Sequence, residues 1–427
     1  MKTFPTVGGG AGPALAAPPS GLRFDHTVLA NGLTIIGEHN PAAATVAAGF
    51  FVNTGARDET PDVSGVSHFL EHMAFKGNDQ YSAEDINRVF DEIGAQYNAY
   101  TSHERTVYYG AVLPGRLPTL LELLSLMMRP VLRQEDFDVE KKVILEEIAM
   151  YQDRPAFQVF DLSSELYWNG HPLGNSILGS TESITALRKE QMAAYHRERY
   201  SPGNLLLTLA GAYDWDAVVD QVTLATAEWV QVPVTRTRPT AATLAGTDGQ
   251  SDAKLNRTHV AVYAPGVGKD DPRRYAAAVL ADAIGDSGGS RLYWELVDKG
   301  LADNASLDHE SSEGEGVFNG YISTAPERAQ AVIELYLATL RRVQDEGLTA
   351  DEWRRAQRKL ATGLTLRAET PLGRLSSLGS GYQATGEYLS VDEVVARVMG
   401  AELATAQELL AERPFDRAYV YTLGPAD

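Results

Sequence analysis

A break in sequence character near the middle of the chain limits its fold more than any other feature. Residues 231–254 are rich in Thr, Pro, Gly, Ala and Asp and show little hydrophobic periodicity, which is typical of a linker. The stretch on each side is roughly 200 residues long and mixes strand patterns with paired long helix patterns. Because the 427-residue chain is too long for one ordinary core, we predict two α+β domains, over residues 22–230 and 255–427.

Predicted strands and helices occur in both halves, which makes a duplicated domain a reasonable hypothesis, although residue identity shows no internal repeat. Turn residues, strand alternation and stop signals such as Gly77 and Gly94 set the expected boundaries. Strands are predicted over residues 33–38, 44–53, 96–101, 106–113, 205–210, 258–264 and 419–423. Helices are predicted over residues 64–76, 82–93, 117–128, 135–152, 272–284, 290–299, 326–345 and 351–367.

The N-terminal residues 1–21 are rich in Gly, Ala and Pro and lack the continuous apolar segment of a signal peptide, so we expect a flexible tail. No apolar run reaches the roughly 20 residues that span a bilayer. The sequence therefore favours a cytoplasmic location without membrane contact. The chain has no cysteine, so any bound metal has to be held by His and carboxylate side chains.

The charge balance bears on possible partners. The formal net charge is -20, from 37 basic and 57 acidic residues. This balance argues against nucleic acid, whose phosphates require a basic protein face. It is compatible with basic or neutral polypeptide substrates, but such a balance more often serves only to keep a protein soluble.

The most informative motif lies inside the helix predicted over residues 64–76. His68 and His72 are four residues apart, so their rings project from one helix face, one turn apart. This spacing suits two imidazoles that bind one zinc ion at about 2.0–2.1 Å each. Glu71 lies on the same side and can take a proton from a water molecule that the metal polarises. The order His-x-x-Glu-His is the inverse of the more familiar zinc helix motif.

A catalytic zinc site needs a third protein ligand and an open fourth position. The helix predicted over residues 135–152 carries three acidic candidates, Glu140, Glu146 and Glu147. Glu140 and Glu147 are seven residues apart and share one face, so one could bind the metal while the other orients a ligating His. Spacing alone does not distinguish Glu146 from Glu147.

The string from His68 to Gly77 resembles the signature of the pitrilysin family, which includes insulin-degrading enzyme and mitochondrial processing peptidase. Five further segments are similar to landmarks of that family, at residues 98–102, 140–147, 172–174, 177–179 and 200–204. The resemblance covers nearly the whole chain after the tail. It implies that Glu147 is the third metal ligand, that Glu140 is a supporting carboxylate, and that each chain binds one Zn²⁺.

The resemblance also implies a fold and a way of binding substrate. Family members of this length have two homologous α+β domains, each a mostly antiparallel sheet backed by long helices, and two such chains close like a clamshell around a chamber. The substrate lies as an extended strand against a sheet edge near the zinc. Asn98 and Ala99 match the residues that hold it, through main-chain hydrogen bonds that do not depend on side-chain sequence.

One part of the chain departs from the family pattern. Active members have an Arg and, seven residues later, a Tyr in the second domain, where they grip the substrate and stabilise the oxyanion. Leu296 and Asp303 stand at these places here, and neither supplies that hydrogen bond if Asp303 is ionised. We therefore expect a heterodimer with a family member that carries the Arg and Tyr, with a homodimer as the alternative.

Residues 285–289, Gly-Asp-Ser-Gly-Gly, match the string around the nucleophile of trypsin-like serine proteases. Those enzymes need a pair of β-barrels and a suitable His earlier in the chain, and neither is predicted here. We interpret the string as a Gly-rich turn before a helix. The turn is either similar to the Gly-rich loop in one subunit of processing peptidases or a simple domain-facing turn.

Together these patterns predict a zinc-dependent endopeptidase that hydrolyses peptides or unfolded polypeptides, with Glu71 as general base. The alternative is a non-catalytic binding or assembly subunit of a family heterodimer. Such subunits usually lose one of the motif residues, whereas this chain has all four. A zinc-stabilised scaffold would have four protein ligands, and only three are apparent.

Overall fold

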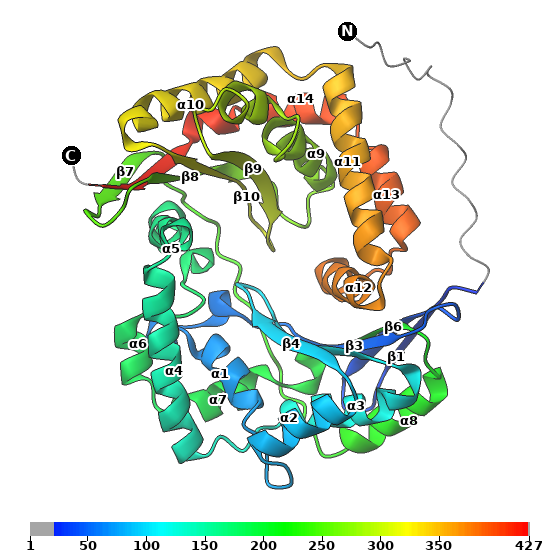
Figure 1. The fold of residues 1–427 in the computed structure, drawn as a ribbon. Coiled ribbons are helices and arrows are strands. Elements are labelled where there is room, and N and C mark those ends of the chain that lie inside the picture. Colours follow the sequence, from blue (N-terminus) through cyan, green and yellow to red (C-terminus); the bar gives the residue numbers. More distant parts are fainter. Residues whose placement is uncertain (1–20, 426–427) are drawn as a thin grey trace.

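The computed structural model describes residues 21–425 of the chain, so nearly all of the expected N-terminal tail lies outside the described residues. Two mixed sheets, each backed by helices, form the structure (Figure 1). The expectation of two α+β units with mostly antiparallel sheets is confirmed.

The first sheet has six strands in the order β1-β2-β6-β3-β5-β4. All neighbouring pairs are antiparallel except β2 and β6. Every residue of β3 and β6 is buried, because helices cover this sheet on both faces, and their apolar runs match that burial. The strands are β1 (Arg23–Val28), β2 (Thr34–His39), β3 (Val46–Val52), β4 (Gln96–Thr101), β5 (Thr106–Val112) and β6 (Leu205–Gly211).

The second sheet has five strands in the order β7-β11-β8-β10-β9. Its pairings repeat those of the first sheet, since only β7 and β11 are parallel. The equivalence of β7-β11-β8-β10-β9 with β2-β6-β3-β5-β4 shows the duplication that residue identity alone does not reveal. The strands are β7 (Gly246–Ser251), β8 (Thr258–Gly266), β9 (Asn304–Ser311), β10 (Gly316–Thr324) and β11 (Tyr419–Gly424).

The helices pack on the faces of these sheets and carry most of the apolar core. In the first half they are α1 (Val66–Ala74), α2 (Ala83–Glu92), α3 (Leu117–Met127), α4 (Gln134–Gln152), α5 (Pro155–Trp168), α6 (Thr181–Ala186), α7 (Lys189–Arg199) and α8 (Trp215–Ala225). In the second half they are α9 (Arg274–Gly285), α10 (Ala329–Glu346), α11 (Ala350–Ala368), α12 (Pro371–Thr385), α13 (Val391–Met399) and α14 (Leu403–Ala411). None of the helices in the described part of the chain is both long and apolar enough to cross a membrane.

Two helices pack against the sheet of the other half. Helix α5 packs its Val159, Tyr167 and Trp168 against β8, β10 and β11 of the second sheet. Helix α12 packs Leu375 and Leu378 against the first sheet, on the face opposite α1 (Figure 1). Each half therefore completes the hydrophobic core of the other.

Several predicted boundaries are wrong. The linker predicted to run to Lys254 ends earlier, because residues 246–251 form β7 and pair with β11 at the sheet edge. Its polar sequence gives no strand pattern, and its pairing depends on a partner far along the chain. The helix predicted over residues 290–299 is present but shorter, over residues 291–297, and it is π-helical over Tyr293–Val297. The predicted elements also leave out strands β1, β7, β9 and β10 and helices α5, α6, α7, α8, α12, α13 and α14.

Candidate metal centre

Helix α1 begins at a backbone position that only glycine adopts easily. Gly65 precedes the helix with φ of 87° and has no side chain to cap the free N–H groups of the first turn. Glu59 supplies that cap, because its carboxylate accepts hydrogen bonds from the N–H of Gly65 at 2.7 Å and of Ser67 at 2.8 Å. Burial raises the pKa of Glu59 to about 8. Glu59 has no signal in the sequence, since it lies outside the helix that it caps.

Helix α4 is fixed beside α1 by two kinds of contact. The rings of Phe69 and Phe137 stack with centroids 4.7 Å apart, and both side chains are buried. Arg133, just before α4, donates a hydrogen bond to the carbonyl oxygen of Lys76, just after α1, at 3.1 Å. These contacts set the distance and rotation between the two helices, so the acidic face of α4 meets the histidine face of α1.

His68, His72 and Glu147 meet between these helices. Oε2 of Glu147 lies 3.8 Å from Nε2 of His68 and 3.5 Å from Nε2 of His72. Ligands at 2.0–2.2 Å from a tetrahedral zinc ion lie about 3.4 Å apart, so these separations leave room for a metal ion between the three atoms. No other group in residues 21–425 brings three such ligand atoms together in this way. Glu146, the alternative from spacing, is exposed.

Glu140 orients the second histidine. Its Oε1 accepts a hydrogen bond from Nδ1 of His72 at 2.9 Å, which leaves Nε2 of that ring free to act as a ligand. Its other oxygen, Oε2, forms an ion pair with Lys76. Burial disfavours the charged carboxylate, but the contacts with His72 and Lys76 outweigh it and lower the pKa of Glu140.

The electrostatics of the two imidazoles differ. Burial, together with the nearby His72, lowers the pKa of His68 to about 3, so its ring is neutral at neutral pH, as a metal ligand has to be. Burial also acts to lower the pKa of His72, but the hydrogen bond that His72 donates to Glu140 and the charges of Glu147 and Glu71 raise it overall.

The donor set fits zinc. Two imidazole nitrogens and one carboxylate oxygen form the open type of site that catalytic zinc occupies. Nδ1 of His68 is buried without a hydrogen-bond partner among the described residues, while its Nε2 is the atom that faces Glu147. The carboxylates that raise the pKa of His72 would equally stabilise a bound cation.

Glu71 lies beside this group and is held from the neighbouring sheet. The hydroxyl of Thr101, the last residue of β4, donates a hydrogen bond to Oε2 of Glu71 at 2.6 Å. Burial raises the pKa of Glu71, and the Thr101 hydrogen bond partly opposes this. The role of Thr101 was not predicted, although it belongs to a segment that the resemblance singled out.

Strand β4 is an edge strand, hydrogen-bonded in the sheet to β5 alone. Its residues alternate in exposure, with Ala99 buried and Asn98 exposed. The backbone N–H of Ala99 donates to Oδ1 of Asn98 at 2.9 Å, so a side chain next to it occupies this backbone donor. The predicted substrate-binding pair, Asn98 and Ala99, thus lies on a sheet edge whose last residue, Thr101, contacts Glu71 of α1.

Of the two positions that depart from the family pattern, one is buried and the other is exposed. Leu296 is fully buried in the second core. Asp303 precedes β9 and forms an ion pair with Arg257. In the Gly-rich string, Gly285 allows the end of α9 to pack closely against β9. A Cβ at this position would lie 2.1 Å from the backbone nitrogen of Leu307. Close packing explains this glycine.

Comparison with protein families and curated proteins agrees with this geometry. The model of insulinase, peptidase family M16, matches residues 34–181, and that of the peptidase M16 inactive domain matches residues 186–360. An uncharacterized zinc protease of Streptomyces coelicolor is 32% identical over 401 residues, covering 91% of this chain and 87% of that protein. The chain belongs to peptidase family M16. The resemblance of this chain to the pitrilysin family, which includes insulin-degrading enzyme, is thereby confirmed.

Other similar proteins extend this picture of the M16 chain. The uncharacterized zinc protease YmxG of Bacillus subtilis is 30% identical, covering 92% of this chain and 96% of that protein. A crystal structure of a protease from Helicobacter pylori has a TM-score of 0.86 at 19% identity, covering 95% and 100% of the two chains. A crystal structure described as a peptidase M16 inactive domain from Pseudomonas fluorescens also has a TM-score of 0.86. These structures share the M16 fold with this chain.

Proposed function

We propose that this M16 chain is a zinc-dependent endopeptidase that hydrolyses peptides or unfolded polypeptides. One observation carries the proposal: the ligand atoms of His68, His72 and Glu147 all lie within 4.8 Å of one another, and Glu71 lies beside them on the same helix as the two histidines. A scaffold role would require a fourth protein ligand, and the described residues offer three.

In this proposal His68, His72 and Glu147 hold one zinc ion per chain. When bound, the zinc supplies Lewis acidity that polarises a carbonyl oxygen and lowers the pKa of a water molecule. Glu71 takes the proton of that water at Oε1, because its Oε2 already accepts the Thr101 hydroxyl. The water oxygen would bond to the carbonyl carbon of the substrate, and as the C–N bond breaks Glu71 would deliver the proton to the departing amine nitrogen. Burial raises the pKa of Glu71, which strengthens it as a base.

The free edge of β4 would receive the substrate as an additional strand. Asn98 and Ala99 would bind its main chain, and Asn98 would first release the Ala99 N–H that it occupies. A polypeptide has to be extended to bind in this way, so folded proteins should resist cleavage. The contacts involve backbone atoms, which predicts broad sequence tolerance along β4.

The substitution Glu71→Gln tests the base assignment. We expect hydrolysis of an unstructured peptide to fall on the order of a thousandfold while the zinc content stays close to one per chain. Zinc content is measured by elemental analysis and hydrolysis by mass spectrometry of the products. If Glu71→Gln cleaves as fast as the parent chain, Glu71 is not the base.

We further propose that full activity requires a second subunit, a family member that carries the Arg and Tyr. Leu296 is fully buried and Asp303 pairs with Arg257, so neither residue offers a hydrogen-bond donor for an oxyanion. The isolated chain should cleave slowly and gain activity from such a partner. Full activity by the isolated chain, alone or as a homodimer, would remove this proposal. No gain with the partner and no cleavage alone, despite bound zinc, would favour a non-catalytic subunit.

A further inference from the structure

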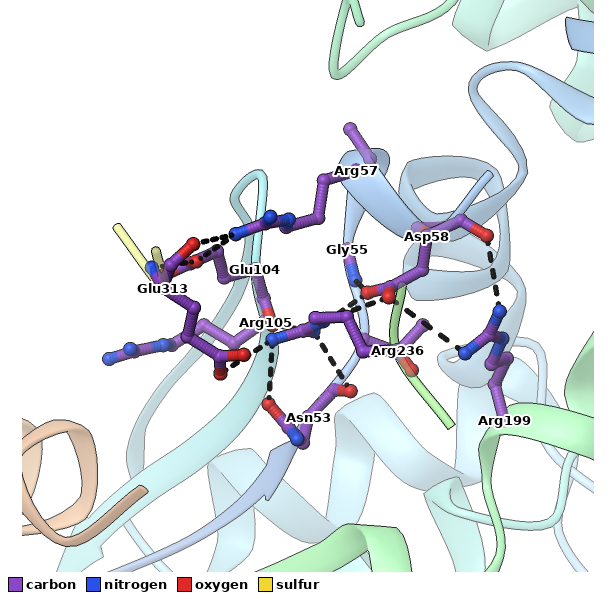
Figure 2. Close-up of polar contacts among 12 residues, drawn as sticks. Asn53, Gly55, Arg57, Asp58, Glu104, Arg105, Arg199, Arg236 and Glu313 are labelled. Atoms are coloured by element: carbon purple, nitrogen blue, oxygen red, sulfur yellow. Dashed lines mark hydrogen bonds and ion pairs between the residues drawn. The ribbon is translucent and has the colours of Figure 1, made fainter. Parts of the chain in front are cut away.

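A dense cluster of charged side chains surrounds the turn between β4 and β5, where both halves of the chain meet (Figure 2). Residues 57 and 58 and the turn itself come from the first half, whereas Lys269 and Glu313 come from the second. Five basic residues share four carboxylates through ion pairs within 4 Å, so the basic residues are in excess even though the whole chain has a net charge of -20. The basic residues are Arg57, Arg199, Arg236, Arg238 and Lys269, and the acidic ones are Asp58, Glu104, Glu198 and Glu313.

The carboxylates of this cluster are all engaged. Glu104 accepts a hydrogen bond from Arg57 at 2.6 Å and from the backbone N–H of Glu313 at 2.7 Å, and it forms an ion pair with Lys269. Burial acts to raise the pKa of Glu104, but these contacts outweigh it and lower that pKa to about 2. Arg236 pairs with Asp58 at 2.7 Å and with Glu313 at 2.9 Å.

Arg105 belongs to the same turn and is the exception. Its backbone is held by Ser102, which donates its N–H to the Arg105 carbonyl oxygen at 2.8 Å. Its guanidinium, with five N–H donors, makes no hydrogen bond or ion pair with any residue between 21 and 425, and no dashed line reaches it in Figure 2. The side chain is nevertheless half-buried.

The direction of the side chain follows from the register of the sheet. Val107 and Tyr109 pack toward α12, so alternation places Arg105 on the same face. Tyr100 pairs with Val107 across the sheet and so lies on that face as well. Thr101, the next residue of β4, holds Glu71. Arg105 therefore lies beside the end of the free edge that leads to the catalytic carboxylate.

We infer that Arg105 binds a carboxylate of the substrate peptide and so makes this M16 chain prefer acidic peptides at one position. The inference rests on the proposed function. A strand added along β4 places alternate side chains on the α12 face, where Asn98, Tyr100 and Arg105 lie. The carboxylate belongs either to an Asp or Glu side chain or to the C-terminus of the peptide.

The surroundings explain why an external anion suits this position. A half-buried guanidinium has lost part of its hydration, and burial lowers the pKa of Arg105 although the group stays charged. Glu104 and Glu313 stabilise its charge from a distance but are committed to other basic residues. A peptide carboxylate could pair with the guanidinium fork in bidentate geometry.

Direct binding tests the inference without turnover. Fluorescent peptides of ten residues, otherwise neutral, carry a single Glu or Gln at each position in turn, and a second series compares a C-terminal acid with the amide. Binding is measured by anisotropy to the zinc-loaded Glu71→Gln chain, which does not cleave them. At one position, or at the C-terminus, we expect the carboxylate to bind about tenfold more tightly than its neutral counterpart.

Three further variants identify the residue responsible. Arg105→Gln should abolish the preference, and Arg105→Glu should reverse it in favour of Lys at the same position. Arg116→Gln is the matched control, since Arg116 is exposed on the turn after β5 and should leave the preference unchanged. Circular dichroism melting checks that each variant is folded.

The outcomes separate this inference from the proposed function. If no position prefers a carboxylate, or if Arg105→Gln keeps the full preference, the inference is wrong. Cleavage of the all-neutral peptide by the parent chain would still support the endopeptidase. If instead the charge preference depends on Arg105 but the parent chain cleaves no peptide, the carboxylate site stands and the hydrolase proposal fails.

Discussion

Helix α1, between β3 and β4, and helix α9, between β8 and β9, occupy equivalent places in two sheets of the same topology. Helix α1 carries His68, Glu71 and His72 at the edge of its sheet. Helix α9 is mostly Ala, Val, Leu and Ile, and its one carboxylate, Asp282, has a pKa that burial raises to about 6. Among the described residues, metal-binding geometry occurs in the first half alone.

The difference teaches that the duplicated scaffold does not by itself create the site. Both halves place a helix next to an edge strand. The candidate metal site occurs only in the half where that helix carries two histidines and a neighbouring helix adds a third ligand residue. In the second half the same place is filled by packing, with Ala277, Leu280 and Ile284 buried. The second half contributes instead through α12, which packs on the other face of the first sheet, and through Lys269 and Glu313, which contact Glu104 at the β4–β5 turn.

The first prediction, with the largest effect, tests this structural contribution. Arg374 of α12 forms a buried bidentate ion pair with Glu38 of β2, at 2.8 and 2.6 Å, and Tyr388 donates to the same carboxylate at 2.7 Å. Arg374→Gln leaves Glu38 buried without its charged partner. The free energy of unfolding should fall by about 3–5 kcal/mol, measured by chemical denaturation.

The matched control is Arg355→Gln, on the exposed face of α11. Its effect should stay within about 0.5 kcal/mol, as for most surface substitutions. Equal effects of Arg374→Gln and Arg355→Gln would mean that α12 does not stabilise the first sheet through this pair. The two halves would then be more independent than their exchanged helices indicate.

The second prediction concerns the asymmetry in metal binding. Glu147→Gln removes a predicted ligand oxygen. Loss of a residue that only hydrogen-bonds to a ligand raises a metal dissociation constant by up to about 100-fold, so loss of the ligand itself should raise that of zinc by more. Glu146→Gln changes the adjacent, exposed residue and should leave zinc affinity unchanged. Competition with a chromogenic chelator measures both constants. Similar losses in the two variants would contradict the assignment of Glu147.

The third prediction separates the ligand from its support. Glu140→Gln weakens the hydrogen bond that orients His72, and zinc affinity should fall by roughly 10- to 100-fold. Glu135→Gln, exposed in the first turn of the same helix, is the control. A loss as large as that of Glu147→Gln would place Glu140 among the ligands themselves.

The fourth and smallest effect concerns the cap of α1. The pKa of Glu59 is about 8 in the folded chain and 4.5 for an unperturbed Glu, so between these values the folded state holds a proton that the unfolded chain has released. Its contribution to stability is complete below pH 4.5 and is lost as the pH rises through 8. Gln cannot ionise, and its one side-chain oxygen replaces the two that accept from Gly65 and Ser67. The free energy of unfolding of Glu59→Gln should therefore be about 1 kcal/mol lower than that of the parent near pH 5.

This gap in stability between Glu59→Gln and the parent should narrow as the pH rises above 5 and change sign before pH 8, because only the parent loses stability over this range. Denaturation at a series of pH values measures it. Glu190→Gln, an exposed position on α7, should show no such trend. A gap that widens with pH would mean that Glu59 is ionised in the folded state.

Local sequence was informative where a single element contains the whole pattern. The spacing of His68, Glu71 and His72 on one helix face follows from 3.6 residues per turn, whatever the rest of the chain does. The alternation of β4 and β5 likewise follows from local composition. Glu140 and Glu147 share a face for the same reason, but nothing in α4 alone says which helix that face meets.

Contacts between distant segments were not readable in this way. Glu59, Thr101 and Arg105 look like ordinary loop or strand-end residues, and their positions depend on how α1, β4 and the second half pack. Strand β7 has a polar sequence and exists because β11 pairs with it, about 170 residues later in the chain. The sequence does not predict helix α5, because its apolar residues pack against the sheet of the other half.

The sequence by itself indicated the residues of α1 in the candidate metal site, because two imidazoles and a carboxylate at fixed helical spacing need no tertiary information to share a face. Tertiary structure decided which acid completes the site, which residue caps its helix, and which Arg near the β4 edge has no partner in the described chain. Those outcomes depend on distances between segments far apart in sequence. Such distances arise only when segments far apart in the sequence bury their apolar faces against one another.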